Sequence, residues 1–166
     1  MNCYIGEEKI GSGCSVFIIA EMSGNHNGSL EQAIKIIHAA KKTGANAIKL
    51  QTYKPDTITL KTDNQDFRIP PESPWAKEQF LYDLYENAYT PWEWHKTLFE
   101  EAKNLDLIVF SSPFDKTAVD FLEELDTPAY KIASPEITDI PLIKYVAQKG
   151  KPILLSTGMA HKEDIE

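Results

Sequence analysis

A repeated alternation of short apolar segments with amphipathic segments constrains the fold of this chain more than any other feature. The apolar segments are typical of buried strands and occupy residues 16–21, 47–53, 107–112, 129–134 and 152–157. Apolar residues at helical spacing lie between successive strands. Strands that alternate with helices in this way predict an α/β fold with a parallel sheet and right-handed crossovers.

The starts of the predicted helices carry capping signals. Ser29 precedes the first helix and Gln32 follows three residues later, as in a capping box. Thr90 is predicted to cap the second helix and Asp115 the third, because both side chains can accept a hydrogen bond from the first helical turn. The fourth helix is predicted over residues 142–149.

Two segments depart from the alternation. Residues 54–89 form a long, proline-containing insertion between a strand and a helix, and long insertions in compact domains are more often functional than idle. Residues 1–15 precede the first strand and are rich in turn formers, so we expect a small hairpin that caps one end of the sheet. Residues 16–166 then form one domain.

The number of strands decides between barrel and open sheet. A closed (β/α)8 TIM barrel takes about 250 residues, whereas this chain has 166 residues and supplies about five strands. We therefore predict an incomplete TIM barrel of about five parallel strands, with the later strands absent. A five-stranded doubly wound sheet is the alternative.

Charge and cysteine content narrow the class of protein. The net charge of −8 argues against nucleic acid as a partner. Cys3 and Cys14 are too few for a disulfide framework or a zinc site and fit a reducing cytosol. The N-terminus lacks the features of a signal peptide, and no apolar run approaches the roughly 20 residues of a membrane span. We expect a cytoplasmic protein without a membrane partner.

Polar side chains gather at the carboxyl ends of all the predicted strands, where α/β enzymes bind ligands. Because strand residues alternate between faces, Lys49 and Gln51 should point into the barrel when Ile48 and Leu50 meet the helices. Lys131 should join them from another strand. Two inward lysines are costly unless an anion lies between them, so the pattern predicts a phosphate or carboxylate site. An ion pair of Lys49 with Glu21, without any ligand, is the alternative.

The four histidines give weaker signals. His26 lies in the loop after the first strand, where a ligand role is possible. His38 borders an apolar helix face and is expected to be structural, whereas His95 is expected on the solvated side of its helix. His161 lies in the C-terminal segment. No pair has metal-ligand spacing, so no metal site is predicted within this chain.

Several segments, in order, resemble the sialic acid synthase family: "IAEMSGNHNGSLEQA", "AIKLQTYKPDT", "FSSPFD", "PAYKIASPE" and "KPILLSTGM". Within that family, "LYDLYENAYTPWEWH" is most similar to the pseudaminic acid synthase branch. The resemblance runs over essentially the whole chain. It implies a TIM-barrel enzyme that condenses phosphoenolpyruvate with an open-chain N-acetylated amino sugar, forming a C–C bond and releasing phosphate by C–O cleavage.

The resemblance also implies roles for individual residues. Glu21 and Lys49 would be catalytic, and phosphoenolpyruvate would be held by Lys49, Gln51, Ser112, Lys131, Ser134 and Ser156. A divalent metal, Mn²⁺ or Mg²⁺, would bind to histidines on later strands, and an antifreeze-like domain from the partner in a homodimer would close the site. These parts lie outside the chain, so the 166 residues alone are expected to be inactive.

Three alternatives to a pseudaminic acid synthase stay open. An N-acetylneuraminate or legionaminate synthase would run the same reaction on another sugar. Synthases of deoxy-sugar phosphates need a site for the sugar's own phosphate, and no arginine cluster here supplies one. The third alternative, from another class, is a non-catalytic half-barrel that serves as a binding or assembly module.

Overall fold

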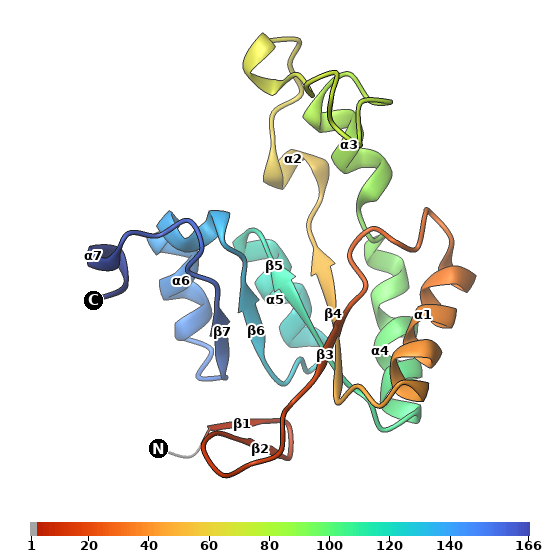
Figure 1. Ribbon diagram of the computed structural model, residues 1–166, viewed down its shortest axis with the longest axis vertical. Helices are drawn as coiled ribbons and strands as arrows, with labels where there is room; N and C mark the ends of the chain where they lie inside the picture. The colour runs from red at the N-terminus through yellow and green to blue at the C-terminus, as the bar shows by residue number, and fades with distance from the viewer. Residues whose placement is uncertain (1–2) are drawn as a thin grey trace.

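The computed structural model describes residues 3–166 and is a half-barrel of parallel strands with helices on its outer side (Figure 1). The strands are β1 (Cys3–Ile5), β2 (Glu8–Ile10), β3 (Ile19–Glu21), β4 (Ala47–Thr52), β5 (Ile108–Pro113), β6 (Tyr130–Ile132) and β7 (Ile153–Leu155). The α-helices are α1 (Leu30–Lys42), α2 (Pro55–Ile58), α3 (Leu81–Ala88), α4 (Trp92–Asn104), α5 (Lys116–Glu124), α6 (Ile140–Ala147) and α7 (Lys162–Ile165). Two 3₁₀ helices, η1 (Gln65–Phe67) and η2 (Pro135–Thr138), complete the set.

The order of the strands identifies the architecture. The main sheet has the order β3-β4-β5-β6-β7, which is the order along the chain, and every neighbouring pair is parallel. A doubly wound sheet would reverse direction at a switch point and carry helices on both faces. Here α1, α4, α5 and α6 cover one face (Figure 1). The predicted incomplete barrel is confirmed, and the doubly wound alternative is wrong.

Residues of β4 alternate between two apolar environments. Ile48 and Leu50 are fully buried in the main core between the sheet and the outer helices. Ala47 belongs to a second cluster inside the half-barrel, with Phe110 of β5. Since successive strand residues point to opposite faces, Lys49 and Gln51 share the inner face with Ala47. The predicted inward orientation of these two side chains follows from this packing.

A hairpin closes the lower end of the half-barrel, where the strands begin. β1 and β2 pair in antiparallel fashion, and Ile5 is buried against the inner cluster with Ala129 from the segment before β6. Figure 1 shows the hairpin beneath the amino ends of the strands. The apolar floor that it completes leaves the polar groups of the inner face at the opposite, carboxyl end.

Two of the three named helix caps agree with the sequence, and one differs. Ser29 Oγ accepts a hydrogen bond from Gln32 N at 3.2 Å, and Asp115 accepts from the first turn of α5, as predicted. The predicted cap of the second helix at Thr90 is wrong, because α4 begins at Trp92 with Pro91 in the cap position. The hydroxyl of Thr90 instead lies 3.3 Å from a ring nitrogen of His26.

The ladders are shorter than the predicted strands at both edges of the sheet. β3 and β7 each have three residues, against six predicted for each. β6 is also reduced from six predicted residues to three, although it lies between β5 and β7 inside the sheet. The insertion between β4 and α4 rises above the carboxyl ends of the strands and contains α2, η1 and α3 (Figure 1). The Tyr82 hydroxyl donates to Asp56 at 3.1 Å and ties α3 to α2.

Candidate anion-binding site

Lys49 is a buried cation on the inner face of β4. Its residue surface is 6% exposed, and its Nζ lies 3.6 Å from Glu21 Oε2 on β3. The parallel register places Glu21 directly beside Lys49. The carboxyl side chain of Glu21 is itself 62% exposed, so it is free to turn toward a ligand or toward the lysine. At 3.6 Å this ion pair is longer than a direct charge-assisted hydrogen bond.

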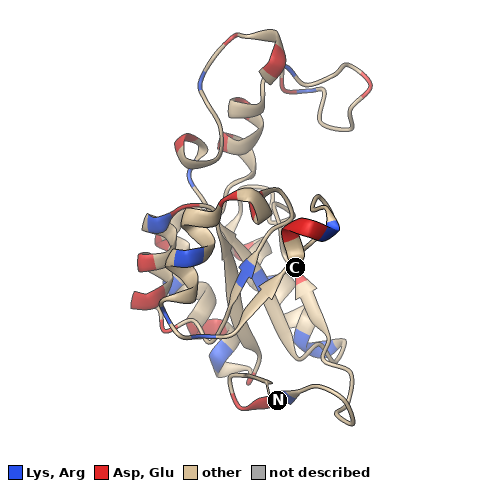
Figure 2. Cartoon of the chain, turned by 90° about the vertical axis from the view of Figure 1, so that its left-hand side faces the viewer, with Lys and Arg blue, Asp and Glu red and all other residues tan. Residues whose placement is uncertain are grey.

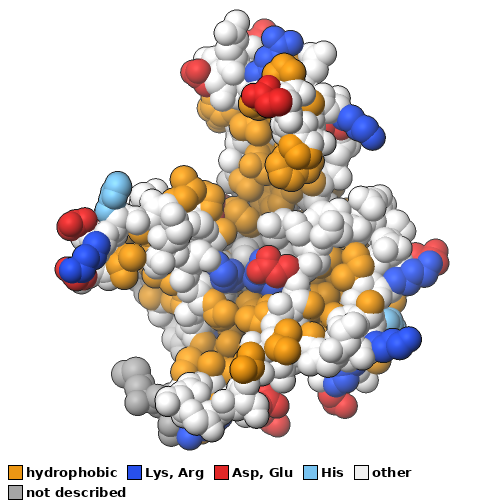
Figure 3. Space-filling model, in the orientation of Figure 1, with side chains coloured by type: hydrophobic (Ala, Val, Ile, Leu, Met, Phe, Trp, Pro, Cys, Tyr) orange, Lys and Arg blue, Asp and Glu red, His pale blue; other side chains and the backbone are white. Residues whose placement is uncertain are grey.

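Lys131 approaches the same space from β6. Its Nζ donates to Ile132 O at 2.7 Å and to the hydroxyl of Ser156, which follows β7. Partial burial lowers the pKa of Lys131, and the positive charge of Lys49 lowers it further. Figure 2 shows basic residues on the sheet itself, and Figure 3 shows basic and acidic side chains together at the centre of the hollow face. Two ammonium groups close enough to repel each other favour an anion between them.

The remaining predicted residues lie along the same rim. Ser112 is 1% exposed, and its Oγ has no hydrogen-bond partner among the described residues, which leaves a buried hydroxyl ready for a ligand. Gln51 lines a pocket beside the rim. Ser134 Oγ accepts from Met159 N at 3.0 Å, so its hydroxyl orders the loop after β7. The structure thus brings Glu21 to Lys49 and Ser156 to Lys131, with Ser112, Gln51 and Ser134 on neighbouring strand ends.

Glu136 is a candidate site residue that the sequence reasoning missed. It lies in η2, immediately after β6, and its Oε2 is buried without a hydrogen-bond partner in the described part of the chain. Burial raises the pKa of the Glu136 carboxyl, and the charge of Lys131 acts in the opposite direction. The signal in the sequence was a carboxylate two residues after Ser134, at a strand end. The raised pKa makes this carboxyl a better proton donor and acceptor at higher pH than an exposed glutamate.

One histidine interpretation is wrong, and two histidines are fully buried. His95 was expected on a solvated helix side, but it is 0% exposed and contacts Thr52 and Pro91. His26, for which a ligand role was possible, is also 0% exposed. Its Nδ1 accepts from Gly28 N at 3.2 Å, and its Nε2 lies 3.3 Å from Thr90 Oγ1. With both ring nitrogens engaged, His26 joins the first loop to the segment before α4 and does not face a ligand.

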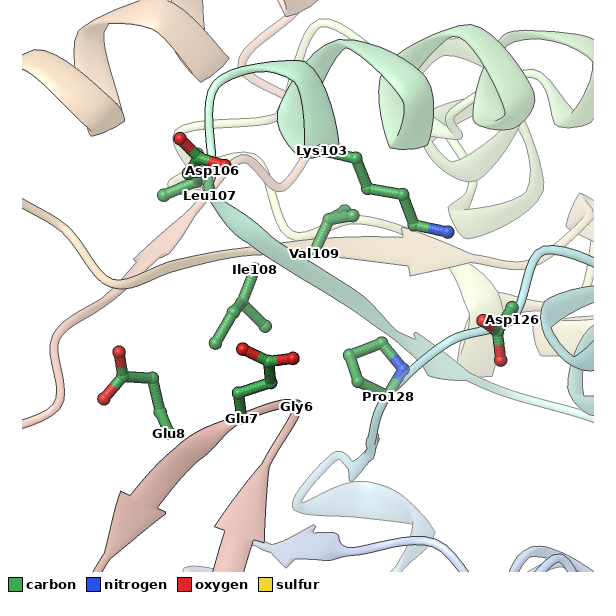
Figure 4. Close-up of a pocket in the computed structure, with 10 residues that line it drawn as sticks. All are labelled: Gly6, Glu7, Glu8, Lys103, Asp106, Leu107, Ile108, Val109, Asp126 and Pro128. Atoms are coloured by element: carbon green, nitrogen blue, oxygen red, sulfur yellow. The ribbon is translucent and has the colours of Figure 1, made fainter.

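A cavity of about 570 Å³ lies at the other end of the strands, between the hairpin turn and the amino end of β5 (Figure 4). Its carboxylates come from the hairpin, as Glu7 and Glu8, and from the loops before β5 and β6, as Asp106 and Asp126. None of the predicted site residues lines this cavity. The polar groups at the carboxyl ends of the strands, rather than this cavity, therefore form the candidate site.

The described chain contains no group of three His, Cys, Asp or Glu side chains placed to hold a metal ion. None of its helices has the length and apolar character that crossing a bilayer requires.

Comparison with known proteins identifies the family of this chain and several of its relatives. A model of the NeuB family matches residues 36–166. The chain is 53% identical over 150 residues to the pseudaminic acid synthase of Campylobacter jejuni, which covers 90% of this chain and 43% of that enzyme. It is 48% identical over 149 residues to the pseudaminic acid synthase of Helicobacter pylori, again covering 90% of this chain and 43% of that enzyme.

A solved structure agrees with these relatives. The N-acetylneuraminic acid synthetase of Leptospira borgpetersenii superposes with a TM-score of 0.84 at 30% identity, covering 99% of this chain and 52% of that one. The chain thus spans less than half the length of the curated relatives that it matches, and about half of this structure. Because the family model matches most of the sequence, and the half-barrel matches the structure of a synthetase, the chain belongs to the NeuB family.

Proposed function

We propose that this chain forms the phosphoenolpyruvate-binding half of a pseudaminic acid synthase. The single observation that carries the proposal is the approach of Lys49 and Lys131 to one space from two strands, each within a partly desolvated environment. Phosphoenolpyruvate carries a phosphate and a carboxylate, so it offers a negative group to each ammonium. The relatives at 53% and 48% identity support pseudaminic acid as the product.

The reaction joins two substrates, so positioning supplies much of the rate. The methylene carbon of phosphoenolpyruvate attacks the aldehyde carbon of the open-chain sugar, water adds to the resulting cation, and the C–O bond to phosphate breaks. In the proposed site, Lys49 and Lys131 hold the anion and compensate the charge of the departing phosphate. Ser112, Ser134, Ser156 and Gln51 are proposed to orient it through hydrogen bonds.

Two carboxyl groups are proposed to move protons during this sequence. Glu21 lies beside Lys49 and is exposed enough to reach a substrate. Glu136 lies within the electrostatic reach of Lys131, and its raised pKa favours a protonated carboxyl more than an ordinary glutamate would. The proton balance of the reaction requires a base that accepts a proton from the attacking water and an acid that returns one to the departing group.

The synthases that the chain resembles use a divalent metal, which supplies Lewis-acid polarisation of the aldehyde oxygen. Residues 3–166 do not provide a set of three ligands, so they do not fit a metal site by themselves. We propose that Mn²⁺ or Mg²⁺ binds to residues of the whole protein outside this chain, and that the whole protein is a cytoplasmic homodimer.

A legionaminate or neuraminate synthase is the second candidate function. The chain is 37% identical to the N,N'-diacetyllegionaminic acid synthase of Legionella pneumophila, below the identity to the pseudaminic acid synthases. Mass spectrometry of the product that the whole protein forms from phosphoenolpyruvate and each acetamido sugar distinguishes the two. Formation of pseudaminic acid supports the proposal, and formation of another nonulosonic acid alone favours the second candidate.

Calorimetric titration with phosphoenolpyruvate tests the anion site in the whole protein. We expect Lys131→Met to weaken binding by about tenfold or more, because a charge-assisted contact contributes about 1.5–3 kcal/mol. Lys144→Met, which removes an exposed lysine of α6, is the control and should leave the affinity unchanged. Equal affinities of the wild type and Lys131→Met would contradict the proposed anion site.

A further inference from the structure

A second pocket adjoins the proposed anion site. It has a volume of about 510 Å³ and lies between the loop after β3 and the last turns of α3. Gln51, which shares the inner face of β4 with Lys49, lines it from below. A pocket of this size is typical of sites for small molecules. It is therefore placed where a second substrate would meet an anion held by Lys49.

The lining of this pocket combines three kinds of side chain. Carboxamides are supplied by Asn25 and Asn87, an aliphatic surface by Leu84, and aromatic rings by Tyr85 and Trp75. Asn25 Nδ2 donates to Met22 O at 2.9 Å, and Asn87 Nδ2 donates to Glu78 Oε1 at 3.1 Å. These bonds orient both carboxamides and leave their oxygens as acceptors for a ligand.

The walls of the pocket are held in place by close packing. A Cβ on Gly24 would lie 3.1 Å from Ala88 O, so the loop after β3 approaches α3 as closely as a glycine allows. The ring of Tyr85 meets the buried ring of Tyr53 edge-on, with centroids 5.7 Å apart. The first loop, β4 and α3 therefore form one preformed surface rather than three independent segments.

Tyr85 also connects this pocket to the proposed reaction site. Burial raises the pKa of its hydroxyl, and the negative charge of Glu136 in η2 raises it further. Electrostatic influence of this kind requires the two groups to be near each other. Since Gln51 of β4 also lines the pocket, a ligand there would lie between α3 and the carboxyl end of the sheet.

We propose that this pocket binds an acetamido group of the sugar substrate, and that α3 of the insertion determines which acetamido sugar is accepted. The inference rests on the proposed function and deepens it. An acetamido group is planar, carries an amide N–H and a carbonyl, and ends in a methyl group. Carboxamide oxygens accept from the N–H, an aromatic face covers the amide plane, and Leu84 covers the methyl group.

A hydroxyl in place of the acetamido group would leave the apolar part of the pocket unfilled. The aliphatic side chain of Leu84 would then face water, and the oriented carboxamide of Asn87 would lose the ligand's N–H. Discrimination of this kind depends on a polar contact and an apolar contact made together. The pocket therefore predicts a preference for acetamido sugars over the corresponding hydroxy sugars.

Two variants of α3 test the proposal in the whole protein. Leu84→Phe adds volume to the pocket, and Asn87→Leu removes a polar contact at an exposed position. For both we expect the KM of the acetamido sugar to rise about tenfold or more, with the KM of phosphoenolpyruvate unchanged. Glu86→Gln, at an exposed neighbouring position of α3, is the matched control and should change neither constant. Unchanged KM values for the sugar in both variants would overturn the proposal, and thermal unfolding checks that each variant folds.

Direct measurement of sugar binding tests the pocket independently of the proposed reaction. Calorimetric titration of the wild type with N-acetylmannosamine and with mannose should show heat of binding for the acetamido sugar only, and Leu84→Phe should abolish it. If that holds while no condensation product forms, the pocket assignment stands and the proposed reaction fails. If condensation occurs but the two variants retain the wild-type KM for the sugar, the pocket assignment fails and the reaction stands.

Discussion

Thr52 and His95 are joined by a buried hydrogen bond of 2.9 Å between Thr52 Oγ1 and His95 Nε2. The other ring nitrogen, Nδ1, lies 3.1 Å from Pro91 O, and a carbonyl only accepts, so Nδ1 carries the proton. Nε2 therefore accepts from Thr52, whose oxygen lies 2.7 Å from Ser111 Oγ and accepts from it. The network lies on the helix side of β4 and β5, one residue away from Gln51 and Ser112.

Removing the hydroxyl of Thr52 should destabilise the protein. Thr52→Val keeps the shape of the side chain but leaves His95 Nε2 without its donor in a fully buried position. We expect a loss of about 1–3 kcal/mol in the free energy of unfolding, the usual cost of an unsatisfied buried polar group. Urea denaturation measures this, with Thr97→Val on the exposed side of α4 as the control. Equal losses in the two variants would contradict a role for the network.

The protein should become less stable as the pH is lowered, because histidines take up protons in the unfolded chain before they do so in the fold. Burial lowers the pKa of His95 from 6.5 to about 4, so the folded protein keeps this ring neutral. The stabilisation is complete above pH 6.5 and is lost progressively as the pH falls from 6.5 toward 4. The slope reaches about 1.4 kcal/mol per pH unit for one such group. Burial lowers the pKa of His26 in the same direction.

Urea denaturation of His95→Gln across the same pH range measures how much His95 contributes to the pH dependence of the free energy of unfolding. The variant should be less stable than the wild type near neutral pH but should lose less stability on acidification, because its side chain does not titrate. His38→Gln serves as the control, since His38 is half exposed and contacts Glu101 at the surface. If the free energy of unfolding of His95→Gln changed with pH as steeply as that of the wild type, groups other than His95 would cause the loss of stability.

Much of the fold could be predicted from residue patterns because each pattern has a local physical cause. Alternation within 47–53 predicted that Lys49 would face inward, since helix packing requires Ile48 and Leu50 on the outer face. Capping by Ser29 and Asp115 depends on residues within three positions of each other. These predictions needed no knowledge of distant partners.

The missed features depend on partners far along the chain. His95 looked like a surface residue because its helix already had an apolar stripe. Its partner Thr52 lies on the strand before that helix, and Ser111, which bonds Thr52, lies on the strand after it. Glu136 looked like an ordinary loop carboxylate, because its burial results from packing that the sequence does not reveal. When a site is assembled from several strands, the burial and the charged neighbours of its residues are known only once the strands are placed side by side.

The affinity of the proposed anion site should depend on pH through Lys131. Burial and the charge of Lys49 lower the pKa of Lys131, so it loses its proton at a lower pH than an ordinary lysine. Affinity for phosphoenolpyruvate should therefore decline on the alkaline side earlier than expected for a free lysine. Removing the neighbouring charge in Lys49→Met should move the titration of Lys131 to higher pH. NMR of ¹³C-methylated lysines reports this titration directly, and an unchanged Lys131 titration in the variant would contradict the proximity of the two groups.

Close packing of Gly24 against α3 predicts a specific mutational coupling. A Cβ at this position would lie 3.1 Å from Ala88 O and 3.3 Å from Ala88 Cβ, so Gly24→Ala should push the loop and α3 apart. We expect a loss of about 1–3 kcal/mol in the free energy of unfolding, as for other overpacked sites. Adding Ala88→Gly should recover part of the loss by removing one of the two contacts. Strictly additive effects in this double-mutant cycle would contradict direct contact between the loop and α3.

Glu136 should oppose folding at neutral pH, because burial disfavours its charged form. Burial raises its pKa above 4.5, so its contribution is favourable below that value and is lost as the pH rises through the raised pKa. Glu136→Gln should therefore increase the free energy of unfolding at neutral pH, by about 1 kcal/mol for a buried group without a partner. The gain should vanish near pH 4, where the wild-type carboxyl is protonated in both states. If the whole protein also loses turnover in this variant, the wild-type carboxyl lowers stability in exchange for activity. If the variant is instead less stable than the wild type at neutral pH, the charge of Glu136 is compensated in the fold and the prediction is contradicted.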